Sequence, residues 1–596
     1  MNGISRSKAF LLMLLAFSFS AIVAKGEGSI QVNPRGVGAT RAYLEHKEVG
    51  KFTGGIARTN RILFIAKRGE TVALASSVDK SYMDEPVDII VKYLQDGRSW
   101  SIDVKGEHDG AATPDKYEGY IAKPINEEAG PWYPMVGEQG NKYKPYLFKV
   151  PYEGVYEVEF IGKQTPVSSG NKNSPADPVE ADWADDTQYE NVAAWDISVF
   201  DVNDKLVNGR VFASYLALIL GDKDKKHYSN LYVLTQDGYL YSMNIKGFDP
   251  QGFILYADNV GLIDDGNGQT LNRNGVSSTS SLTPINGGVV TVQPDLDAKD
   301  DVLTHRLFFN EPDPNIEFMH GGFPVSPQPI ASIVNCNFIG NTNQEDKNGN
   351  ADESMGGVFS VELDRRSTYE IIIDCDKNGN FNNNINDSGY SDRVMTAAGC
   401  VGVNYLSWNG LDGNGKQLPI GEYNIQVRTH AGDFHFPMGD VENNPEGIEI
   451  KLLNALAYQS TGKDDEKQYR AWYDARKYTT HNKTLINPEG AYAPNPLYID
   501  MDYSTDDDIT KGGFMKFKNN YGDFTIVDVW SYVVNDGRSV TQSTITLSPK
   551  GSNNYAFISG TTYFEKTRNG KYDNGERGVD GVMLTLYDAS NNPVLR

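Results

Sequence analysis

The sequence has little of what several common functional classes need. Its 596 residues include only three cysteines, Cys336, Cys375 and Cys400, too few for a scaffold built on disulfides. Cys375 and Cys400 could bridge within one domain, or all three thiols could be reduced and buried. Lysine and arginine total 55 against 79 aspartates and glutamates, and the net charge of −24 argues against nucleic acid and anionic membranes as partners.

Familiar catalytic motifs are also missing. There is no G-x-S-x-G elbow, no glycine-rich phosphate loop and no histidine that pairs evidently with a cysteine. His430 and His435 lie five residues apart on a predicted strand and its turn, which is not the helical spacing of a zinc protease. We therefore predict a protein that is not an enzyme.

What the sequence does have is the pattern of a β protein. Aromatic residues make up 11% of the chain, tyrosines (34) outnumber phenylalanines (25), and 59 glycines punctuate short alternating runs. The runs 146–160 and 231–243 each contain a turn signal and are predicted to form hairpins. The fold class expected is mainly β, with tandem Ig-like β-sandwich domains and a short helical connector, whose helix is placed at residues 464–478.

The first 26 residues have the pattern of a secretory signal peptide. Arg6 and Lys8 precede an apolar stretch from Ala9 to Val23, and cleavage could follow Ala24 or Gly26. No later stretch is apolar enough to span a bilayer, so no transmembrane span is expected. The predicted location is secreted or on a bacterial cell surface.

Composition shifts divide the rest of the chain into seven parts. In order they are a β-sandwich domain, a linker, a β-rich domain, an Ig-like domain with an Asp/Asn-rich loop, a helical or irregular connector, a β segment and an incomplete module. Their predicted bounds are 27–165, 166–188, 189–325, 329–452, 453–510, 511–550 and 556–596.

One candidate calcium loop follows the predicted strand 369–373. Oxygen-bearing side chains stand at the first, third, fifth and ninth positions, a glycine (Gly379) at the sixth, and Asn380 can offer its carbonyl at the seventh. The closing glutamate is missing, so Asp387 or water would have to complete the shell. The predicted ligands are Asp374, Asp376, Asn378, Asn380, Asn382 and Asp387.

A second candidate loop lies near the end of the sequence, between the alternating runs 561–564 and 582–587. It has the same spacing, with Gly570 at the turn, the carbonyl of Lys571 available and a terminal glutamate. The predicted ligands are Glu565, Thr567, Asn569, Lys571, Asp573 and Glu576. Both loops offer only oxygen, so Ca²⁺ is the cofactor predicted.

Two stretches resemble known families. The run F-E-K-T-R-N-G-K-Y-D-N-G-E-R-G-V-D-G-V resembles the B-type repeat of serine-aspartate repeat adhesins, which implies a calcium-binding β-sandwich, although Glu565 and Thr567 depart from the usual Asp and Asn. The run W-N-G-L-D-G-N-G-K-Q-L-P-I-G-E-Y is similar to the Ig-like domain of flagellar hook-cap proteins. That second resemblance implies a core Trp408, a turn from Asp412 to Lys416 and inward-facing Tyr423, Ile425 and Val427.

Together these features favour a secreted adhesin or extracellular scaffold made of calcium-stabilised β modules. The expected partners are an extracellular polysaccharide or a ligand on a host or cell surface, with self-association in a surface layer or filament as another option. The alternative hypothesis is a secreted carbohydrate-active enzyme, or a carbohydrate-binding protein, with accessory β modules.

Overall fold

The computed structural model of the protein describes most of the chain after residue 25. The described ranges are 26–34, 40–46, 60–78, 89–102, 118–162, 190–220, 226–249, 252–277, 288–292, 294, 301–342, 347–381, 389–439, 441–454, 471–489, 516–534, 540–549, 562–564, 577–579, 582, 584, 586–587 and 593–595. Residues 1–25 of the predicted signal peptide and all of the predicted linker lie outside them.

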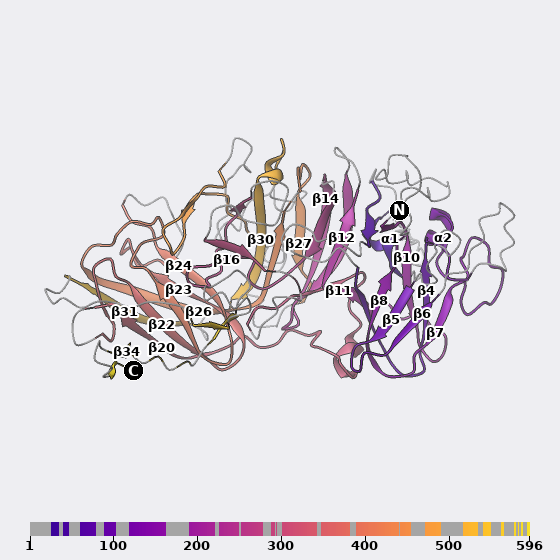
Figure 1. Cartoon of the computed structure of the whole chain (residues 1–596), viewed down its shortest axis with the longest axis horizontal. Coiled ribbons are helices and arrows are strands. Elements are labelled where there is room, and N and C mark those ends of the chain that lie inside the picture. The colour runs from indigo at the N-terminus through magenta and orange to yellow at the C-terminus, as the bar shows by residue number, and fades with distance from the viewer. Residues whose placement is uncertain are drawn as a thin grey trace, which may run out of the picture.

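The described chain is mainly β, as predicted, and its sheets stand in a row (Figure 1). Helix is confined, in these ranges, to α1 (Ser29–Val32), α2 (Pro124–Ala129) and two 3-10 turns (Pro314–Phe318 and Tyr521–Asp523). Over the same residues no helix has both the length and the apolar character needed to cross a membrane.

A β-sandwich forms the N-terminal end of the row. One sheet has the order β1-β10-β4-β7 and packs on one half of a nine-stranded sheet, whose order there is β11-β3-β8-β5-β6. Aromatic rings from the two sheets meet in the core. For example, the ring centroids of Phe160 and Trp195 are 5.5 Å apart. The strands are β1 (Glu27–Gly28), β3 (Ile62–Ala66), β4 (Thr71–Ser76), β5 (Ile89–Tyr93), β6 (Ser99–Ile102), β7 (Tyr146–Lys149), β8 (Gly154–Phe160), β10 (Trp195–Phe200) and β11 (Val211–Ala213).

The strands predicted at 146–160 form, but not as a hairpin. Strand β7 pairs with β4, whereas β8 pairs with β3 and β5 in the opposite sheet. The turn between them is therefore an arch from one sheet to the other. The reason lies in the core: Phe148 and Tyr156 face each other across the two sheets, with ring centroids 5.8 Å apart, so each strand buries its side chains against the other.

The predicted linker at 166–188 does not separate two independent sets of strands. Beyond it, β10 returns to pair with β4 and β11 pairs with β3, so the predicted domains 27–165 and 189–325 share both sheets of the N-terminal sandwich. A segment rich in proline and aspartate predicts a loop, but it carries no information about where the chain goes next.

The nine-stranded sheet continues into a central body. Its other half has the order β27-β14-β13-β19, and a four-stranded sheet of order β15-β12-β2-β9 contributes to the same core. The hairpin predicted at 231–243 is confirmed: β13 and β14 pair on either side of Asp237-Gly238. The strands are β2 (Tyr43–Glu45), β9 (Asn191–Val192), β12 (Tyr215–Ile219), β13 (His227–Leu234), β14 (Leu240–Phe248), β15 (Gly252–Tyr256), β19 (Arg306–Phe308) and β27 (Ile448–Leu452).

A second sandwich forms the other end of the row, left in Figure 1. A sheet of order β20-β22-β25 shares one core with the strands β24-β23-β26-β31, and β21 pairs with β31. Trp408, Tyr423, Ile425 and Val427 are all buried there, as predicted. The strands are β20 (Ile333–Gly340), β21 (Asn350–Asp352), β22 (Gly357–Leu363), β23 (Ser367–Ile373), β24 (Arg393–Gly399), β25 (Gly402–Trp408), β26 (Gly421–Met438) and β31 (Val540–Ser548).

Strand β26 belongs to both the second sandwich and the central body. Residues 421–428 pair with β31 and residues 425–430 with β23, whereas its last residues pair with β30 (Thr525–Val534) of the body. A β-bulge between Ala431 and Phe434 marks the change. The sandwich predicted at 329–452 is therefore completed by strand β31, which lies in the predicted β segment 511–550. Strand β27 lies within 329–452 but pairs with β14 of the central body.

The described part of the predicted connector helix is not helical. Residues 471–478 are extended or turned, and Trp472 exchanges backbone hydrogen bonds of 2.8 and 3.0 Å with Trp530 on strand β30. The same residue packs on Tyr532 with ring centroids 5.0 Å apart. Pairing with the edge of β30 gives the backbone N–H and C=O groups of Trp472 hydrogen-bond partners. This pairing replaces the helix that the local composition favours.

The remaining strands are short pairs. They comprise β16 (Leu262–Asp264) with β18 (Val289–Thr291), β28 (Tyr478–Thr479) with β29 (Leu485–Ile486), β32 (Tyr563–Phe564) with β33 (Arg577–Gly578), and β34 (Leu586–Tyr587) with β35 (Pro593–Leu595), while β17 (Gly275–Val276) pairs with β30. Strands β32 and β33 flank the second candidate calcium loop.

The shared sheets predict how fragments behave. A fragment of residues 27–165 lacks β10, whose Trp195, Ile197 and Val199 are buried in the sandwich core. Each such side chain contributes about 1.5–3 kcal/mol, against a total of about 5–15 kcal/mol for a domain. We expect this fragment to lack a cooperative thermal transition and a longer one, 27–325, to show one by circular dichroism. Cooperative melting of the short fragment would contradict the shared-sheet arrangement.

Candidate metal centre

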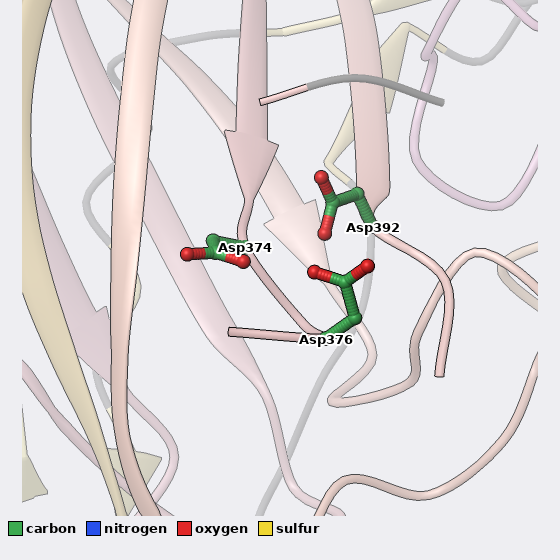
Figure 2. A group of neighbouring side chains, drawn as sticks. All are labelled: Asp374, Asp376 and Asp392. Atoms are coloured by element: carbon green, nitrogen blue, oxygen red, sulfur yellow. The ribbon is translucent and has the colours of Figure 1, made fainter. Parts of the chain in front are cut away.

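Three carboxylates meet at the neck of the loop that joins β23 to β24. Asp374 and Asp376 follow the end of β23, and Asp392 immediately precedes β24. One oxygen from each lies within 4.8 Å of the others. In Figure 2 the carboxylates of Asp376 and Asp392 face each other, and Asp374 lies beside them. Two of the predicted ligands therefore come together, with a third carboxylate from the far side of the loop.

The buried carboxylate of Asp374 organises the turn. Its Oδ1 accepts a hydrogen bond from the backbone N–H of Asn378 (3.0 Å), and its Oδ2 accepts one from Gly379 (3.1 Å). Gly379 has a φ of +79°, in the left-handed region that glycine tolerates best, so a glycine suits this position of the turn. The turn holds the Asp374 oxygens near the loop's neck, and the backbone N–H of Asp374 donates to the carbonyl of Asn424 on β26 (2.9 Å).

The next predicted ligands bond to one another. Asp376 accepts from the backbone N–H and the side-chain amide of Asn378, at 3.1 and 2.7 Å. The amide oxygen of Asn378 accepts in turn from the backbone of Asn380 (2.6 Å). Asn378 thus supports the turn and is outside the carboxylate triad. Asn382 and Asp387 lie beyond the described residues, so their predicted roles stay predictions.

Asp392 is the member that sequence reasoning missed. Its Oδ1 accepts from the backbone N–H of Cys375 (2.9 Å), which ties the end of the loop to its beginning. The loop spacing rule sees only neighbours in sequence, and Asp392 stands beyond it. A signal was nevertheless available in the sequence. Asp374 directly follows one strand and Asp392 directly precedes the next, and the two ends of a loop between paired strands lie together.

A second buried aspartate positions the end of the loop. Asp412 accepts from the backbone N–H of Ser391 with Oδ2 (3.1 Å), and from Asn414 and Lys416 with Oδ1 (2.9 and 2.7 Å). The turn predicted at 412–416 is therefore built around this side chain. Because Ser391 adjoins Asp392, Asp412 fixes the backbone that presents the third carboxylate of the triad.

The basic side chains nearest in sequence have other contacts. The ammonium of Lys377 lies 4.3 Å from the centre of the Tyr423 ring. The buried guanidinium of Arg393 donates to the side-chain oxygen of Gln269 (3.3 Å), and burial lowers the pKa of Arg393.

The donor set is suited to a hard cation. The three residues offer only carboxylate oxygen, which favours Mg²⁺, Ca²⁺ or Mn²⁺ over metals that prefer nitrogen or sulfur. Ca²⁺ takes about 6–8 oxygens in flexible geometry, so carbonyls and water would supply the rest of its shell. The residues thus fit the cofactor predicted, without distinguishing calcium from the other hard cations.

Further predictions concern the three cysteines and the second candidate loop. Cys336, Cys375 and Cys400 are all free, so no disulfide joins Cys375 to Cys400. Burial raises the pKa of the Cys375 thiol well above its ordinary value. The second candidate loop lies outside the described residues, so the ligands predicted there stay predictions: Glu565, Thr567, Asn569, Lys571, Asp573 and Glu576.

An acidic cleft of about 670 Å³ lies between the N-terminal sandwich and the central body, lined in part by Asp201, Glu311 and Asp313. A glycoside hydrolase needs a carboxylic acid whose pKa is raised. Backbone N–H groups of Lys205 and Asn203 lower the pKa of Asp201. For Asp313, backbone hydrogen bonding and Arg210 outweigh burial and also lower the pKa. Neither aspartate is therefore suited to be the general acid.

Comparisons with known proteins add little. No protein-family model and no curated protein matches the sequence. Among solved structures the chain is similar to a DUF4785 family protein from Legionella pneumophila subsp. pneumophila str. Philadelphia 1, at 10% sequence identity and a TM-score of 0.11, with 67% of this chain and 84% of that chain covered. A score of this size supports no inference about fold or function.

The role of Asp412 can be tested without metal. In Asp412→Asn the side-chain NH2 group would replace the oxygen that accepts from Ser391. The buried backbone N–H of Ser391 would then lack an acceptor. We expect the free energy of unfolding in chelator to fall by about 1–3 kcal/mol. Asp376→Asn is the control, because its amide oxygen can still accept from Asn378, and we expect a change of about 0.5 kcal/mol or less. Equal effects of both substitutions in urea unfolding would refute this role.

Proposed function

We propose that the protein is a secreted bacterial cell-surface adhesin or extracellular scaffold, in which calcium stabilises the β-sandwich units. The observation that carries the proposal is the triad of Asp374, Asp376 and Asp392 at the neck of the β23–β24 loop. A cation held there joins the two ends of the loop and so resists its opening. Loop stiffening of this kind serves a load-bearing or ligand-presenting protein and contributes no chemistry of its own.

The arrangement of the sheets supports a mechanical role. The N-terminal sandwich, the central body and the second sandwich stand in a row (Figure 1) and are joined by shared sheets and by the continuous strand β26. Such a molecule transmits force along hydrogen-bonded strands. The strongly acidic composition, with a net charge of −24, suits a solvated extracellular surface rich in sites for divalent cations.

The second sandwich offers a surface for a partner. On strand β25, Val403 and Tyr405 are exposed, while the alternate residues Leu406 and Trp408 are buried. Ile339 on β20 is exposed on the same outer face of the β20-β22-β25 sheet. Tyrosine combines apolar area with a polar hydroxyl, which suits contact with a polysaccharide, a cell-surface ligand or a second copy of the chain.

Calcium binding predicts a stability response. A ligand that binds only the folded state at about 100 times its Kd adds about 2.7 kcal/mol to the free energy of unfolding. We expect millimolar Ca²⁺ to raise Tm by roughly 5 °C over protein in chelator. The measurement is differential scanning calorimetry of the intact protein, and a Tm unaffected by Ca²⁺ would remove the basis of the proposal.

Variants assign the response to the triad. Asp374→Ala/Asp376→Ala should abolish part of the Ca²⁺ response, and Asp392→Asn should weaken it. The charge-matched control is Glu138→Gln/Glu317→Gln, which removes two exposed carboxylates far from the loop and should leave the response intact. Any response left in the triad variants should disappear on adding Glu576→Gln if the second loop also binds calcium. A full response in Asp392→Asn would contradict the composition of the triad.

A further inference from the structure

Two buried histidines occupy the place where strand β26 leaves the second sandwich and enters the central body. His430 precedes the bulge between Ala431 and Phe434, and His435 follows it. Both side chains are at most 4% exposed. The elements that surround them come from both units: β23 from the sandwich, and β30 with residues 258 and 305 from the body.

His430 lies between two carboxylates. Its Nε2 is 3.4 Å from an oxygen of Glu370 on β23, and its Nδ1 is 3.6 Å from an oxygen of Asp433 in the bulge. The imidazole stacks on Tyr532 of β30, with ring centroids 3.9 Å apart and planes within 3°. Glu370 also pairs with Arg428, so one cation is already present on the sandwich side.

His435 has a matching environment on the body side. Its Nδ1 is 2.8 Å from Asp528 Oδ2 on β30, and its backbone exchanges hydrogen bonds of 2.8 and 3.1 Å with Asp258. Asp258 and Asp528 are buried, and each has one carboxylate oxygen without a hydrogen bond. His305 donates from Nε2 to the carbonyl of Asp433 (2.5 Å), with Arg306 next to it in the chain.

The charges at this junction balance best when the two imidazoles are protonated. Four carboxylates face them, those of Glu370, Asp433, Asp528 and Asp258, while Arg428 pairs with Glu370. Burial opposes a charged imidazole, but the neighbouring carboxylates outweigh it, and the pKa of each histidine is raised. Burial also raises the pKa of Asp258 to about 7. The two histidines therefore titrate above pH 6.5, and Asp258 titrates at about 7.

We propose that His430 and His435 form a proton-operated lock between the second sandwich and the central body. Protonated, the His430 imidazolium holds Glu370 of the sandwich and Asp433 of the bulge, and the His435 imidazolium holds Asp528 and Asp258 of the body. Deprotonated, the rings leave buried carboxylates without countercharge, and the bulge loosens. The lock would let an exported protein change the stiffness of its central joint with the pH of its surroundings, and it is independent of the metal centre.

The direction of the pH effect follows from the pKa values. A histidine whose folded pKa exceeds 6.5 contributes stability that is complete below pH 6.5 and is lost as pH rises through the folded pKa. The raised pKa of Asp258 likewise makes the fold less stable as pH rises. His227 and His305 act in the opposite direction, because burial lowers their pKa to about 3 and they weaken the fold as pH falls below 6.5.

The test compares His430→Gln/His435→Gln with the wild-type protein between roughly pH 6 and roughly pH 9. Each unit by which a pKa is raised is worth a factor of about ten in the unfolding equilibrium constant. The stability advantage of the wild type should therefore shrink as pH rises through this range. Backbone hydrogen exchange at residues 428–438, corrected for intrinsic rates, should speed up with pH in the wild type only. A constant advantage would overturn the proposal.

The matched control is His227→Gln. His227 is also fully buried, but no carboxylate contributes to its titration, and its ring lies against Phe253 at 5.3 Å. The stability difference between this variant and the wild type should be flat above neutral pH. A difference that falls in parallel with that of the double variant would show a general effect of removing imidazoles and would overturn the lock.

A measurement on the wild type guards against variants that fail to fold. In protein labelled with ¹³C at histidine Cε1, we expect at least two of the eight histidine resonances to titrate with midpoints above 6.5. The single variants His430→Gln and His435→Gln assign them by the resonance that each lacks. A spectrum in which no histidine titrates above 6.5 would rule out the lock without any substitution.

Discussion

The structure depends on the need of every buried backbone N–H and C=O for a hydrogen-bond partner. Strand β26 meets that need first with β23 and β31 and then, past its bulge, with β30. Its side chains follow the same division, because Tyr423 lies in the core of the second sandwich and Phe434 in that of the central body. The two units consequently share one hydrogen-bonded strand, and the bulge is the only place along it where the register shifts.

Local features of the sequence predicted local features of the structure. The Asp237-Gly238 turn, the inward row of Tyr423, Ile425 and Val427, and the turn at Gly379 were all predictable. Each depends on alternation or turn chemistry within a few residues, and such signals report burial and backbone conformation directly. The mainly β class follows from the same signals repeated along the chain.

Pairing between distant segments was beyond the same reasoning. The alternation in 146–160 predicts two strands, but their partners are chosen by the whole core, and the strands enter different sheets. Asp392 completes the carboxylate triad from the far end of a long loop, outside any spacing rule. Trp472 pairs with Trp530 because β30 offers a free edge there, and the sequence around Trp472 contains no sign of that edge.

The position of strand β31 has a consequence for biogenesis. It closes the second sandwich by pairing Gly421 with Leu547, and strands β27 and β30, which come between β26 and β31 in the sequence, belong to the central body. Contacts between residues this far apart form slowly, because the intervening chain must first be brought into place. A chain that emerges from its N-terminus would leave this sandwich open until its last strand arrived, so its apolar interior would need a chaperone's protection meanwhile.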